Sequence, residues 1–330
     1  MEPTSLPETY KALVPVKPGE TPRLETLALP KPGVNQILVK VAYAPINPSD
    51  INSMYGGYIQ NNDFIGVEGS GTVVALGRDL TVPFTIGQKV HITGPGTMAQ
   101  YILLDCFSAS PVQDGLSLEQ AACHIGNPGM VLYMAHVAQQ GGHKAAIHTA
   151  GSSALGRMLI RYFKEKGIKT INIVRKEEYI QELKDEGADY VLNSTAPDFE
   201  SQLKVIAEKE QATNAFDAIA GDFTNKVVTA LPAGSICYVY GSLSGSHDVN
   251  SISIMELFKG KKITGLYLTN YVLELTKNRT IGELFKEAHS RLTTTFKTSI
   301  QKVFKLEDIA EALAYWEKNS SKGKILLQPN

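Results

Sequence analysis

The chain has 330 residues, of which 43% are hydrophobic and 20% are charged. This length exceeds what one hydrophobic core usually supports, so two domains are expected. The 32 basic and 33 acidic side chains nearly cancel, which argues against a general electrostatic affinity for nucleic acid or anionic membranes. Three widely spaced cysteines, Cys106, Cys123 and Cys237, exclude a disulfide framework and a four-cysteine zinc lobe.

Nothing in the sequence resembles a membrane-spanning or targeting segment. No apolar run approaches the roughly 18 residues that a spanning helix needs. The first twenty residues contain Glu2, Glu8 and Glu20 and lack the apolar centre of a signal peptide. We therefore expect a cytoplasmic protein, and a mitochondrial location stays open for a form whose transit peptide has been removed.

The first 117 residues are expected to be rich in β-strands, because short β-branched segments separated by glycine and proline occupy residues 36–42, 71–76 and 89–92. From residue 118 the pattern changes, and Ser117 is placed to cap a helix. Strands are expected at 145–149, 170–174, 190–192, 216–220, 235–240 and 262–268, with helices between them, among them 154–166 and 199–209. This alternation predicts βαβ units and a parallel sheet. The chain ends with a predicted helix at 306–318 and a strand at 324–327.

The turn after the strand at 145–149 contains mostly small residues, AGSSALG over residues 150–156. Small residues let the backbone approach a pyrophosphate, which is held by free N–H groups at the start of the next helix. The strict G-x-G-x-x-G pattern is not present, and a plain tight turn is the alternative. The position of this turn between a strand and a helix favours a dinucleotide site.

The next strand ends in Arg175 and Lys176. An NAD-specific site usually has an acidic residue here to bind the ribose 2′-hydroxyl, whereas a 2′-phosphate requires cations. A guanidinium binds phosphate with two hydrogen bonds. We therefore expect NADPH rather than NADH, although Glu177 and Glu178 reduce the local positive charge and a solvated basic pair is the alternative.

No pattern of metal ligands is present in the sequence. The seven histidines form no HxH or HxxxH spacing, and His124 beside Cys123 is the one His–Cys neighbour pair. Adjacent side chains on a helix diverge and would not share an ion. We expect metal-free chemistry, and His148 is interpreted as a core residue.

Residues 66–71 (GVEGSG) resemble the G-H-E-x-x-G segment of the medium-chain dehydrogenase/reductase superfamily. Val67 stands where zinc-dependent members have a histidine ligand, and the segment from Asn47 to Asp50 stands where they have their first zinc cysteine. The resemblance implies the zinc-independent branch and an α/β fold. The resemblance also implies two domains, a GroES-like catalytic domain (1–117 and 269–330) and a Rossmann NADPH-binding domain (118–268). We interpret Asp50 as a helix cap, and Glu68 as a partner of backbone groups or of a buried cation.

Within that branch, residues 44–52 (APINPSDIN) and 56–58 (GGY) resemble the mitochondrial-type trans-2-enoyl-thioester reductases. The resemblance implies that Tyr58 is the proton donor and that Asn47 is a second catalytic residue. It also implies a set of cofactor contacts, which are Asn127, Ser152, Ser153, Ala154, Leu155, Arg175, Tyr240, Gly241, Ser242, Leu243, Leu266, Tyr267, Leu268, Thr269 and Lys324. Lys322 is an alternative to Lys324. Lys176, beside Arg175, is added to this set as a second cation. A homodimer joined through edge strands of the cofactor domains is implied as well.

The function expected from these observations is metal-free, NADPH-dependent reduction of the C=C bond of 2-enoyl thioesters. Such a reaction develops enolate charge and needs a proton donor, and a tyrosine is protonated at neutral pH. Two alternatives stay open. The first is an NADPH:quinone oxidoreductase on the same scaffold, and the second is an NADPH-binding protein without significant turnover.

Overall fold

The computed structural model describes residues 6–17, 19–54, 64–246, 248–278 and 280–330. The chain divides into two compact units. The first contains residues 1–126 and 297–330, and the second contains residues 127–296. The sequence analysis placed the domain boundaries after residues 117 and 268, so the two divisions differ mainly in the assignment of residues 269–296.

The first unit is built mainly from antiparallel strand pairs, with one parallel pair near the C-terminus. A two-stranded sheet pairs β1 (Thr9–Val14) with β2 (Arg23–Ala28). A seven-stranded sheet has the order β14-β15-β3-β4-β5-β7, with β6 also paired to β3. Its strands are β3 (Gln36–Pro45), β4 (Glu68–Leu76), β5 (Lys89–Thr93), β6 (Tyr101–Asp105), β7 (Ala109–Pro111), β14 (Ile300–Lys305) and β15 (Lys324–Gln328). The C-terminal segment thus completes a sheet that the N-terminal residues begin.

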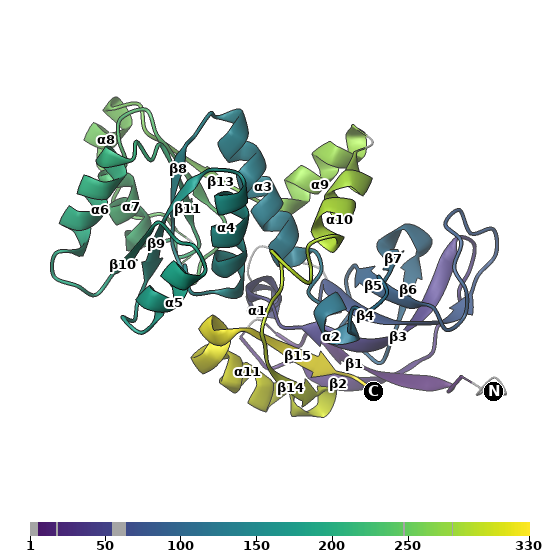
Figure 1. Ribbon diagram of the computed structural model, residues 1–330. Helices are drawn as coiled ribbons and strands as arrows, with labels where there is room; N and C mark the ends of the chain where they lie inside the picture. Colours follow the sequence, from purple (N-terminus) through teal and green to yellow (C-terminus); the bar gives the residue numbers. More distant parts are fainter. Residues whose placement is uncertain (1–5, 18, 55–63, 247, 279) are drawn as a thin grey trace. The chain divides into compact units, whose positions relative to one another are not determined.

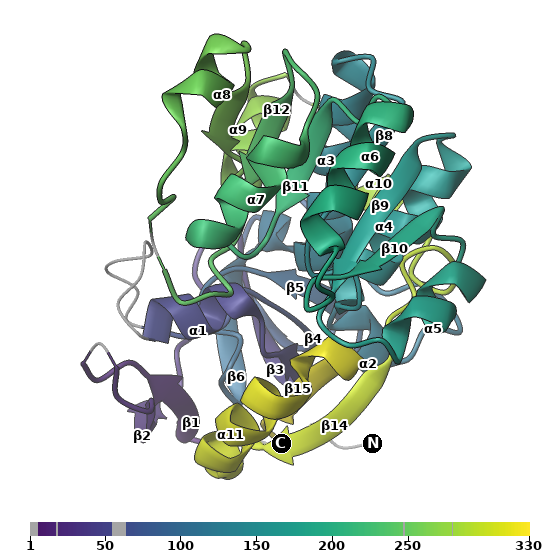
Figure 2. The same cartoon turned by 90° about the vertical axis from the view of Figure 1, so that its left-hand side faces the viewer.

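Helices of the first unit are short and lie beside this sheet. They are α1 (Pro48–Met54), α2 (Leu118–Ala121) and α11 (Ile309–Asn319), with 3-10 turns η1 (Cys106–Ser108), η2 (Leu306–Asp308) and η3 (Ser320–Lys322). Figure 2 shows β14 and β15 side by side with α11 next to them. Leu306, Ile309 and Leu313 join Ile325 and Leu327 in one buried cluster, so the apolar face of α11 covers the sheet.

The second unit contains six parallel strands in the order β10-β9-β8-β11-β12-β13. They are β8 (Ala145–His148), β9 (Lys169–Val174), β10 (Tyr190–Asn193), β11 (Asn214–Asp217), β12 (Ile236–Val239) and β13 (Lys262–Gly265). The helices between and after them are α4 (Ala154–Glu165), α5 (Tyr179–Asp185), α6 (Phe199–Lys209), α7 (Asp222–Ala230), α8 (Ile254–Phe258), α9 (Leu268–Lys277) and α10 (Ile281–His289). The helix α3 (Gly126–Gln140) begins at the boundary between the units. The labels in Figure 1 allow this order to be followed.

Helices cover both faces of the parallel sheet. Ile171 and Ile173 of β9 pack in one buried cluster with α6 and α7, including Leu203. The side chain of Val174 points to the other face of the sheet, where it packs with Leu183 of α5. The expected α/β fold, with a β-rich part and a doubly covered parallel sheet, is therefore confirmed.

Helices α9 and α10 pack within the second unit. Tyr271 of α9 stacks on Tyr133 of α3, with 4.3 Å between ring centroids. Glu287 of α10 accepts a hydrogen bond from the Tyr162 hydroxyl (3.2 Å), and Arg291 forms an ion pair with Glu165 of α4. These contacts explain why residues 269–296 group with the parallel sheet in the structure.

Two of the expected strands end three residues earlier in the structure than the sequence predicts. The strand expected at 216–220 is β11, which ends at Asp217, because the Asp217 carboxylate accepts hydrogen bonds from the N–H groups of Ile219 (2.9 Å) and Ala220 (3.3 Å) and so folds the chain into a turn. The strand expected at 262–268 ends at Gly265, and Leu268 already begins α9. Among the described helices, none combines the length and the apolar character needed to cross a membrane.

Candidate functional site

A buried polar cluster forms in the first unit where β3, α1 and β15 meet. Strand β15 pairs antiparallel with β3 through Leu326 opposite Pro45 and Leu327 opposite Ala44. The N–H of Ile46 donates to the carbonyl of Ile325 at 3.0 Å. Continuing this register by two residues places Lys324 opposite Asn47, and the Lys324 ammonium donates a hydrogen bond to Asn47 Oδ1. Two segments from opposite ends of the chain therefore meet here.

The orientation of the Asn47 amide is fixed by its two partners. Asn47 is 5% exposed, and its Nδ2 donates to Glu68 Oε1 at 3.1 Å. A lysine ammonium is a donor only, and an ionised carboxylate is an acceptor only. Because Lys324 meets the amide oxygen and Glu68 meets the amide nitrogen, a flipped amide would lose both hydrogen bonds.

Glu68 connects this cluster to the chain that leads into α3. Its Oε2 accepts hydrogen bonds from the N–H groups of Ile125 and Gly126, both at 3.0 Å. The side chain is 1% exposed, so these bonds replace the water that an isolated carboxylate would require. The interpretation of Glu68 as a partner of backbone groups is confirmed.

Asp50 has the role of a helix cap that the sequence analysis assigned to it. Its Oδ2 accepts a hydrogen bond from the N–H of Asn47 at 2.8 Å, at the start of α1. Its Oδ1 has no partner among the described residues. Burial raises the pKa of Asp50 to about 7, and the charge of Glu68 acts in the same direction, while the hydrogen bond from Asn47 and the charge of Lys324 lower it.

The sequence analysis also named Tyr58 and Lys322 in this unit. Tyr58, the expected proton donor, lies outside the described residues. Lys322, the alternative to Lys324, lies in η3 and is exposed.

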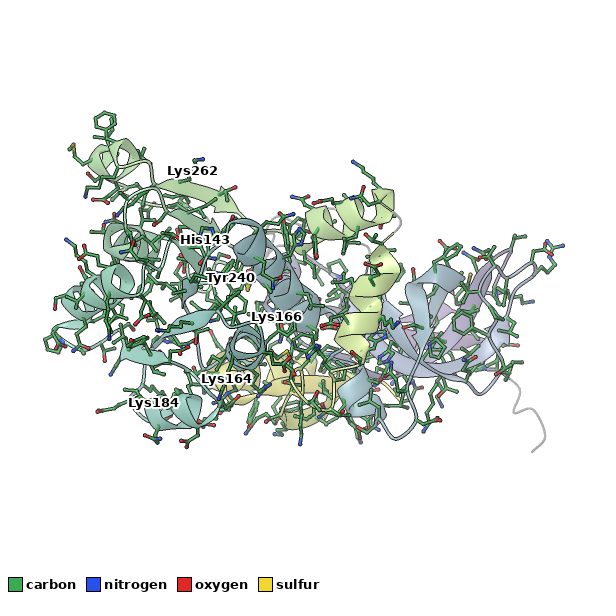
Figure 3. The ribbon with its side chains drawn as sticks, turned by 45° about the horizontal axis from the view of Figure 1, so that its top comes forward. His143, Lys164, Lys166, Lys184, Tyr240 and Lys262 are labelled. Atoms are coloured by element: carbon green, nitrogen blue, oxygen red, sulfur yellow. The ribbon has the colours of Figure 1, made fainter. Side chains whose placement is uncertain are left out.

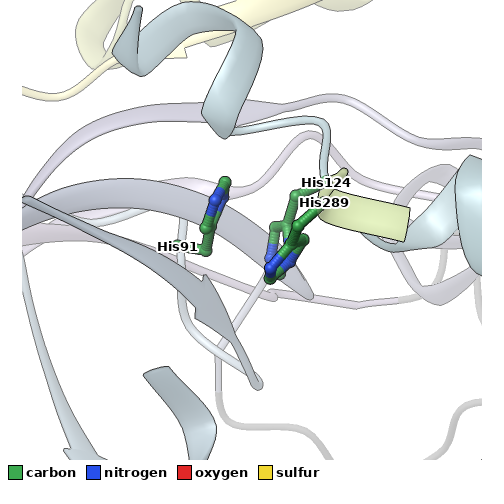
Figure 4. Close-up of side chains that lie close together, drawn as sticks. All are labelled: His91, His124 and His289. Atoms are coloured by element: carbon green, nitrogen blue, oxygen red, sulfur yellow. The ribbon is translucent and has the colours of Figure 1, made fainter. Parts of the chain in front are cut away.

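Figure 4 shows the buried rings of His91 and His124 side by side, with 4.7 Å between their centroids. His91 Nδ1 lies 2.9 Å from the Ala121 carbonyl, and His124 Nε2 lies 3.0 Å from that of Ile92, so both rings are held by backbone groups.

In the second unit, the small-residue turn links β8 to α4. Ala150 has a positive φ of 55°, and the N–H of Gly151 donates to the Ile173 carbonyl at 2.9 Å, which ties the turn to the end of β9. Ser153 is the N-cap of α4, and its hydroxyl accepts a hydrogen bond from the N–H of Gly156 at 3.0 Å. The first N–H groups of an α-helix have no acceptor within the helix. The N–H groups of the two helix residues between Ser153 and Gly156 therefore remain for a ligand.

The two glycines of this turn are required by close packing. A Cβ at Gly156 would lie 2.3 Å from the Gly151 carbonyl oxygen, and a Cβ at Gly151 would lie 2.9 Å from Asn172 Cβ. The start of α4 thus approaches the turn as closely as the backbone allows. This is the cradle that a pyrophosphate needs, and the residues present fit a dinucleotide.

Further predicted cofactor residues follow the carboxyl ends of neighbouring parallel strands, which meet at one edge of the sheet. Arg175 and Lys176 follow β9, and both are exposed. Lys176 lies 3.5 Å from Glu178, whereas Arg175 makes no ion pair with the described residues. The other segments of this kind are Ser152–Leu155 after β8, Tyr240–Leu243 after β12 and Leu266–Thr269 after β13, and the structure places them at this same edge, whereas Asn127 lies in the first turn of α3.

A polar pair at this edge was not found by sequence reasoning. The hydroxyl of Tyr240, labelled in Figure 3, lies 2.7 Å from His148 Nε2, and the two rings are stacked. Burial lowers the pKa of His148 to about 3, so its imidazole is neutral, and burial also raises the pKa of Tyr240. His148 is a core residue, as expected, but its Nδ1 has no partner among the described residues. The two residues are 92 positions apart, and no local signal in the sequence joins them.

A second network at the same edge holds β8 against β11. The Thr149 hydroxyl donates to Asp217 Oδ1 at 2.8 Å and accepts a hydrogen bond from the N–H of Ala218 at 2.7 Å. Thr224 of α7 donates to Asp217 Oδ2 at 2.6 Å. All four residues are buried. The loops that carry the predicted cofactor residues therefore start from a rigid base.

Two family models match the chain. The family described as alcohol dehydrogenase GroES-like domain matches residues 33–140, and the family described as zinc-binding dehydrogenase matches residues 186–327. Among curated proteins, the mitochondrial enoyl-[acyl-carrier-protein] reductase of Xenopus tropicalis is 29% identical over 279 residues, which are 78% of this chain and 76% of that protein. Prostaglandin reductase-3 of Mus musculus is 24% identical over 317 residues, 91% of this chain and 83% of that protein.

Solved structures resemble the chain over nearly its whole length. A candidate NADPH:quinone reductase from Mesorhizobium loti is 31% identical, with a TM-score of 0.87 and coverage of 99% of this chain and 100% of that chain. The Escherichia coli quinone oxidoreductase in complex with NADPH is 21% identical, with a TM-score of 0.84, and covers 97% of this chain and 100% of its own. At that identity the second likeness concerns the fold alone.

Proposed function

The chain belongs to the medium-chain dehydrogenase/reductase family of NAD(P)H-dependent oxidoreductases, and from this premise we propose that it reduces the C=C bond of 2-enoyl thioesters with NADPH. The observation that carries the proposal is the segment from residue 44 to 58, which resembles the enoyl-thioester reductases and contains Asn47 in a fixed orientation. The similarity to mitochondrial enoyl-[acyl-carrier-protein] reductases supports it.

The preference for NADPH rests on Arg175. A 2′-phosphate is recognised by a guanidinium that can form two parallel hydrogen bonds, and Arg175 is exposed without an ion pair to the described residues. We expect Arg175→Ala to weaken NADPH binding at least tenfold while NADH binding changes little, since charge-assisted hydrogen bonds contribute about 1.5–3 kcal/mol. Arg23→Ala is the matched control, because Arg23 lies in β2 of the first unit, pairs with Glu25 and has no assigned role in cofactor binding. Equal losses for NADPH and NADH in Arg175→Ala would refute the assignment.

In the proposed reaction, bound NADPH supplies a hydride to the β-carbon of the enoyl thioester. Negative charge then develops on the thioester oxygen, and a positioned donor stabilises it. One Nδ2 hydrogen of Asn47 is bonded to Glu68, and we assign the other to the substrate carbonyl or the nicotinamide amide. Tyr58 donates its hydroxyl proton to the α-carbon and recovers it from solvent. Asn127 is assigned to the nicotinamide.

The reaction is tested by following NADPH oxidation with crotonyl-CoA. We expect turnover by the wild type and a loss of about 10²-fold or more in kcat for Tyr58→Phe, because general acid catalysis contributes about 10²–10⁴-fold. Tyr315→Phe is the matched control. Tyr315 packs on Phe304 of β14, with 5.6 Å between ring centroids, and it has no role in the proposed chemistry. Absence of turnover in the wild type would contradict the proposed substrate, and unchanged turnover in Tyr58→Phe would contradict the proton donor.

The second candidate function is NADPH:quinone oxidoreduction. The 31% identity to the Mesorhizobium loti protein favours it. A hydroquinone takes its protons from water, so this reaction does not require a tyrosine donor. A quinone in the same assay would be reduced faster than crotonyl-CoA, and Tyr58→Phe would leave its rate unchanged. NADPH binding by calorimetry, with no oxidation by enones, enoyl thioesters or quinones, would instead indicate a binding protein.

We also propose a homodimer through β13, the edge strand of the parallel sheet. The N–H groups of Lys262 and Leu266 donate toward β12. Because direction alternates along a strand, the N–H groups of Ile263 and Gly265 face the open edge. Helix α8, which precedes β13 in the chain, has exposed apolar side chains, including Phe258 with 74% of its surface exposed. Gly265→Pro removes one outward N–H and is expected to give a monomer by light scattering. Gly265→Ala keeps that N–H and has free space for its Cβ, so it is expected to stay dimeric. A dimeric Gly265→Pro would contradict this interface.

A further inference from the structure

Lys324 is a buried cation in the first unit. It is 6% exposed, and a lysine is almost never buried without a partner. Its ammonium donates to Asn47 Oδ1, and its charge lowers the pKa values of both Asp50 and Cys123. Glu68 acts on the same two groups in the opposite direction. The Lys324 ammonium and the Glu68 carboxylate therefore face each other across the Asn47 amide, one at its oxygen and one at its nitrogen.

The segment from Asn47 to Asp50 and Val67 stand where zinc-dependent members of the family have metal ligands, and the residues present here do not fit zinc. Val67 has no donor atom, and Asn47 Oδ1 is occupied by the Lys324 ammonium. Both carboxylate oxygens of Glu68 accept hydrogen bonds. An ammonium has no lone pair to offer a metal, and its charge repels a second cation at short range.

Cys123 does not supply the missing ligand. Cys123 is 3% exposed, and burial raises the pKa of its thiol to about 12. The thiolate is the form that binds metals, so at neutral pH this side chain is a neutral thiol. The donor set of the cluster is therefore an amide, two carboxylates and an ammonium.

We propose that the Lys324 ammonium is the resident cation of this cluster, in place of a metal ion, and that Lys324 is a positioning residue for Asn47. The role of Lys324 as a cation is independent of the reaction. Its positioning role rests on the proposed function, because it acts through the role of Asn47 in catalysis. Lys324 thereby differs from the cofactor contact that the family resemblance implied.

The hydrogen-bonding chemistry explains why a cation is needed. Asn47 can present its amide in two orientations, and a neutral partner such as a hydroxyl accepts either of them. An ammonium facing the oxygen and a carboxylate facing the nitrogen permit one orientation only. The remaining Nδ2 hydrogen then has a fixed direction. Misplacing such a group by about 1 Å can lower a rate by about 10²-fold.

The first test separates positioning from cofactor binding in the full-length chain. We expect Lys324→Met to lower kcat by about 10²-fold, while the NADPH dissociation constant, measured by cofactor fluorescence, stays within about twofold of the wild type. Lys324→Gln keeps a donor for Asn47 Oδ1 without the charge and is expected to lose less activity. Arg175→Ala provides the opposite pattern. Weakening of NADPH binding by Lys324→Met as large as that by Arg175→Ala would overturn the proposal.

The second test does not depend on turnover. Asp50→Asn is introduced into the wild type, into Lys324→Met and into Lys324→Gln, and the change that it causes in the free energy of unfolding is measured from pH 5 to pH 9. The pH dependence of this change gives a titration midpoint for Asp50 in each background. Removing the ammonium leaves the Asp50 carboxylate without its cation, so this midpoint is expected to move to higher pH in both Lys324→Met and Lys324→Gln. An unchanged midpoint in both variants would overturn the proposed cation, as would zinc binding by the wild type that Glu68→Gln abolishes. If crotonyl-CoA is not a substrate, this test still decides the question.

Discussion

Asp50 provides the sharpest test of the electrostatics of the first unit. Its carboxylate is 1% exposed and accepts one hydrogen bond, from the N–H of Asn47 at 2.8 Å. An asparagine in its place keeps an oxygen that can accept this bond and has nearly the same volume. Asp50→Asn therefore removes the ionisable group without opening a cavity.

The magnitude follows from the two pKa values of the carboxyl group. The pKa of Asp50 is about 7 in the folded chain, where burial raises it, against 3.8 for an unperturbed aspartate. Between these values the folded state keeps a proton that the unfolded state has lost, so stability falls as pH rises, by about 1.4 kcal/mol per pH unit. The stabilising contribution is fully present below the unfolded pKa and is lost as pH rises through 7. Between pH 5 and pH 7 the loss amounts to about 2 kcal/mol.

Urea unfolding of the wild type and of Asp50→Asn at several pH values measures this contribution. The free energy of unfolding of the variant minus that of the wild type should rise by about 2 kcal/mol from pH 5 to pH 7 and level off above pH 8. Asp114→Asn is the matched control, because its carboxylate is exposed rather than buried. A constant difference for Asp50→Asn would refute the raised pKa and the burial that causes it.

Two further predictions concern the cofactor edge of the second unit. Gly156→Ala places a Cβ 2.3 Å from the Gly151 carbonyl oxygen. It should lower the free energy of unfolding by about 1–3 kcal/mol and weaken NADPH binding in a fluorescence titration, whereas Gly282→Ala, with open space at its Cβ, should stabilise α10 by up to about 1 kcal/mol. Tyr240→Phe removes the one hydrogen bond that the His148 ring makes with the described residues and should cost about 1–3 kcal/mol in thermal or urea unfolding. Unchanged stability in Tyr240→Phe would show that solvent replaces the phenol.

The fold was predictable because its signals are local. The helix expected at 199–209 is present with those bounds, and the helix cap at Ser117 accepts the expected hydrogen bond from the N–H of Gln120 at 3.3 Å. Period-2 alternation and small-residue turns depend on near neighbours in the sequence, so they can be recognised in a single chain. The same holds for the turn from Ala150 to Gly156, whose residues matter through their size.

The polar partners were less predictable because they are distant in sequence. The end of β11 depends on the Asp217 carboxylate, which bonds to Thr149 from β8 as well as to its own turn. The pairing of His148 with Tyr240 likewise requires two strand ends to lie at one edge of a sheet. Side-chain hydrogen bonds between such elements leave no periodic pattern, so the sequence indicates which groups are polar but not which groups they bind.

Lys324 shows how the structure resolves an ambiguity of this kind. The family resemblance favoured Lys324 and left Lys322 as an alternative, since both are lysines two positions apart near the end of the chain. In a strand, residues two positions apart share a face, so alternation could not separate them. The pairing of β15 with β3 does so, because it sets Lys324 opposite Asn47, across 277 positions of sequence, while Lys322 ends a 3-10 turn on the surface. A one-residue slip of that register would turn the ammonium to the other face of the sheet and leave the buried carboxylates without a cation. The register of β15 therefore also decides whether the candidate site contains a cation.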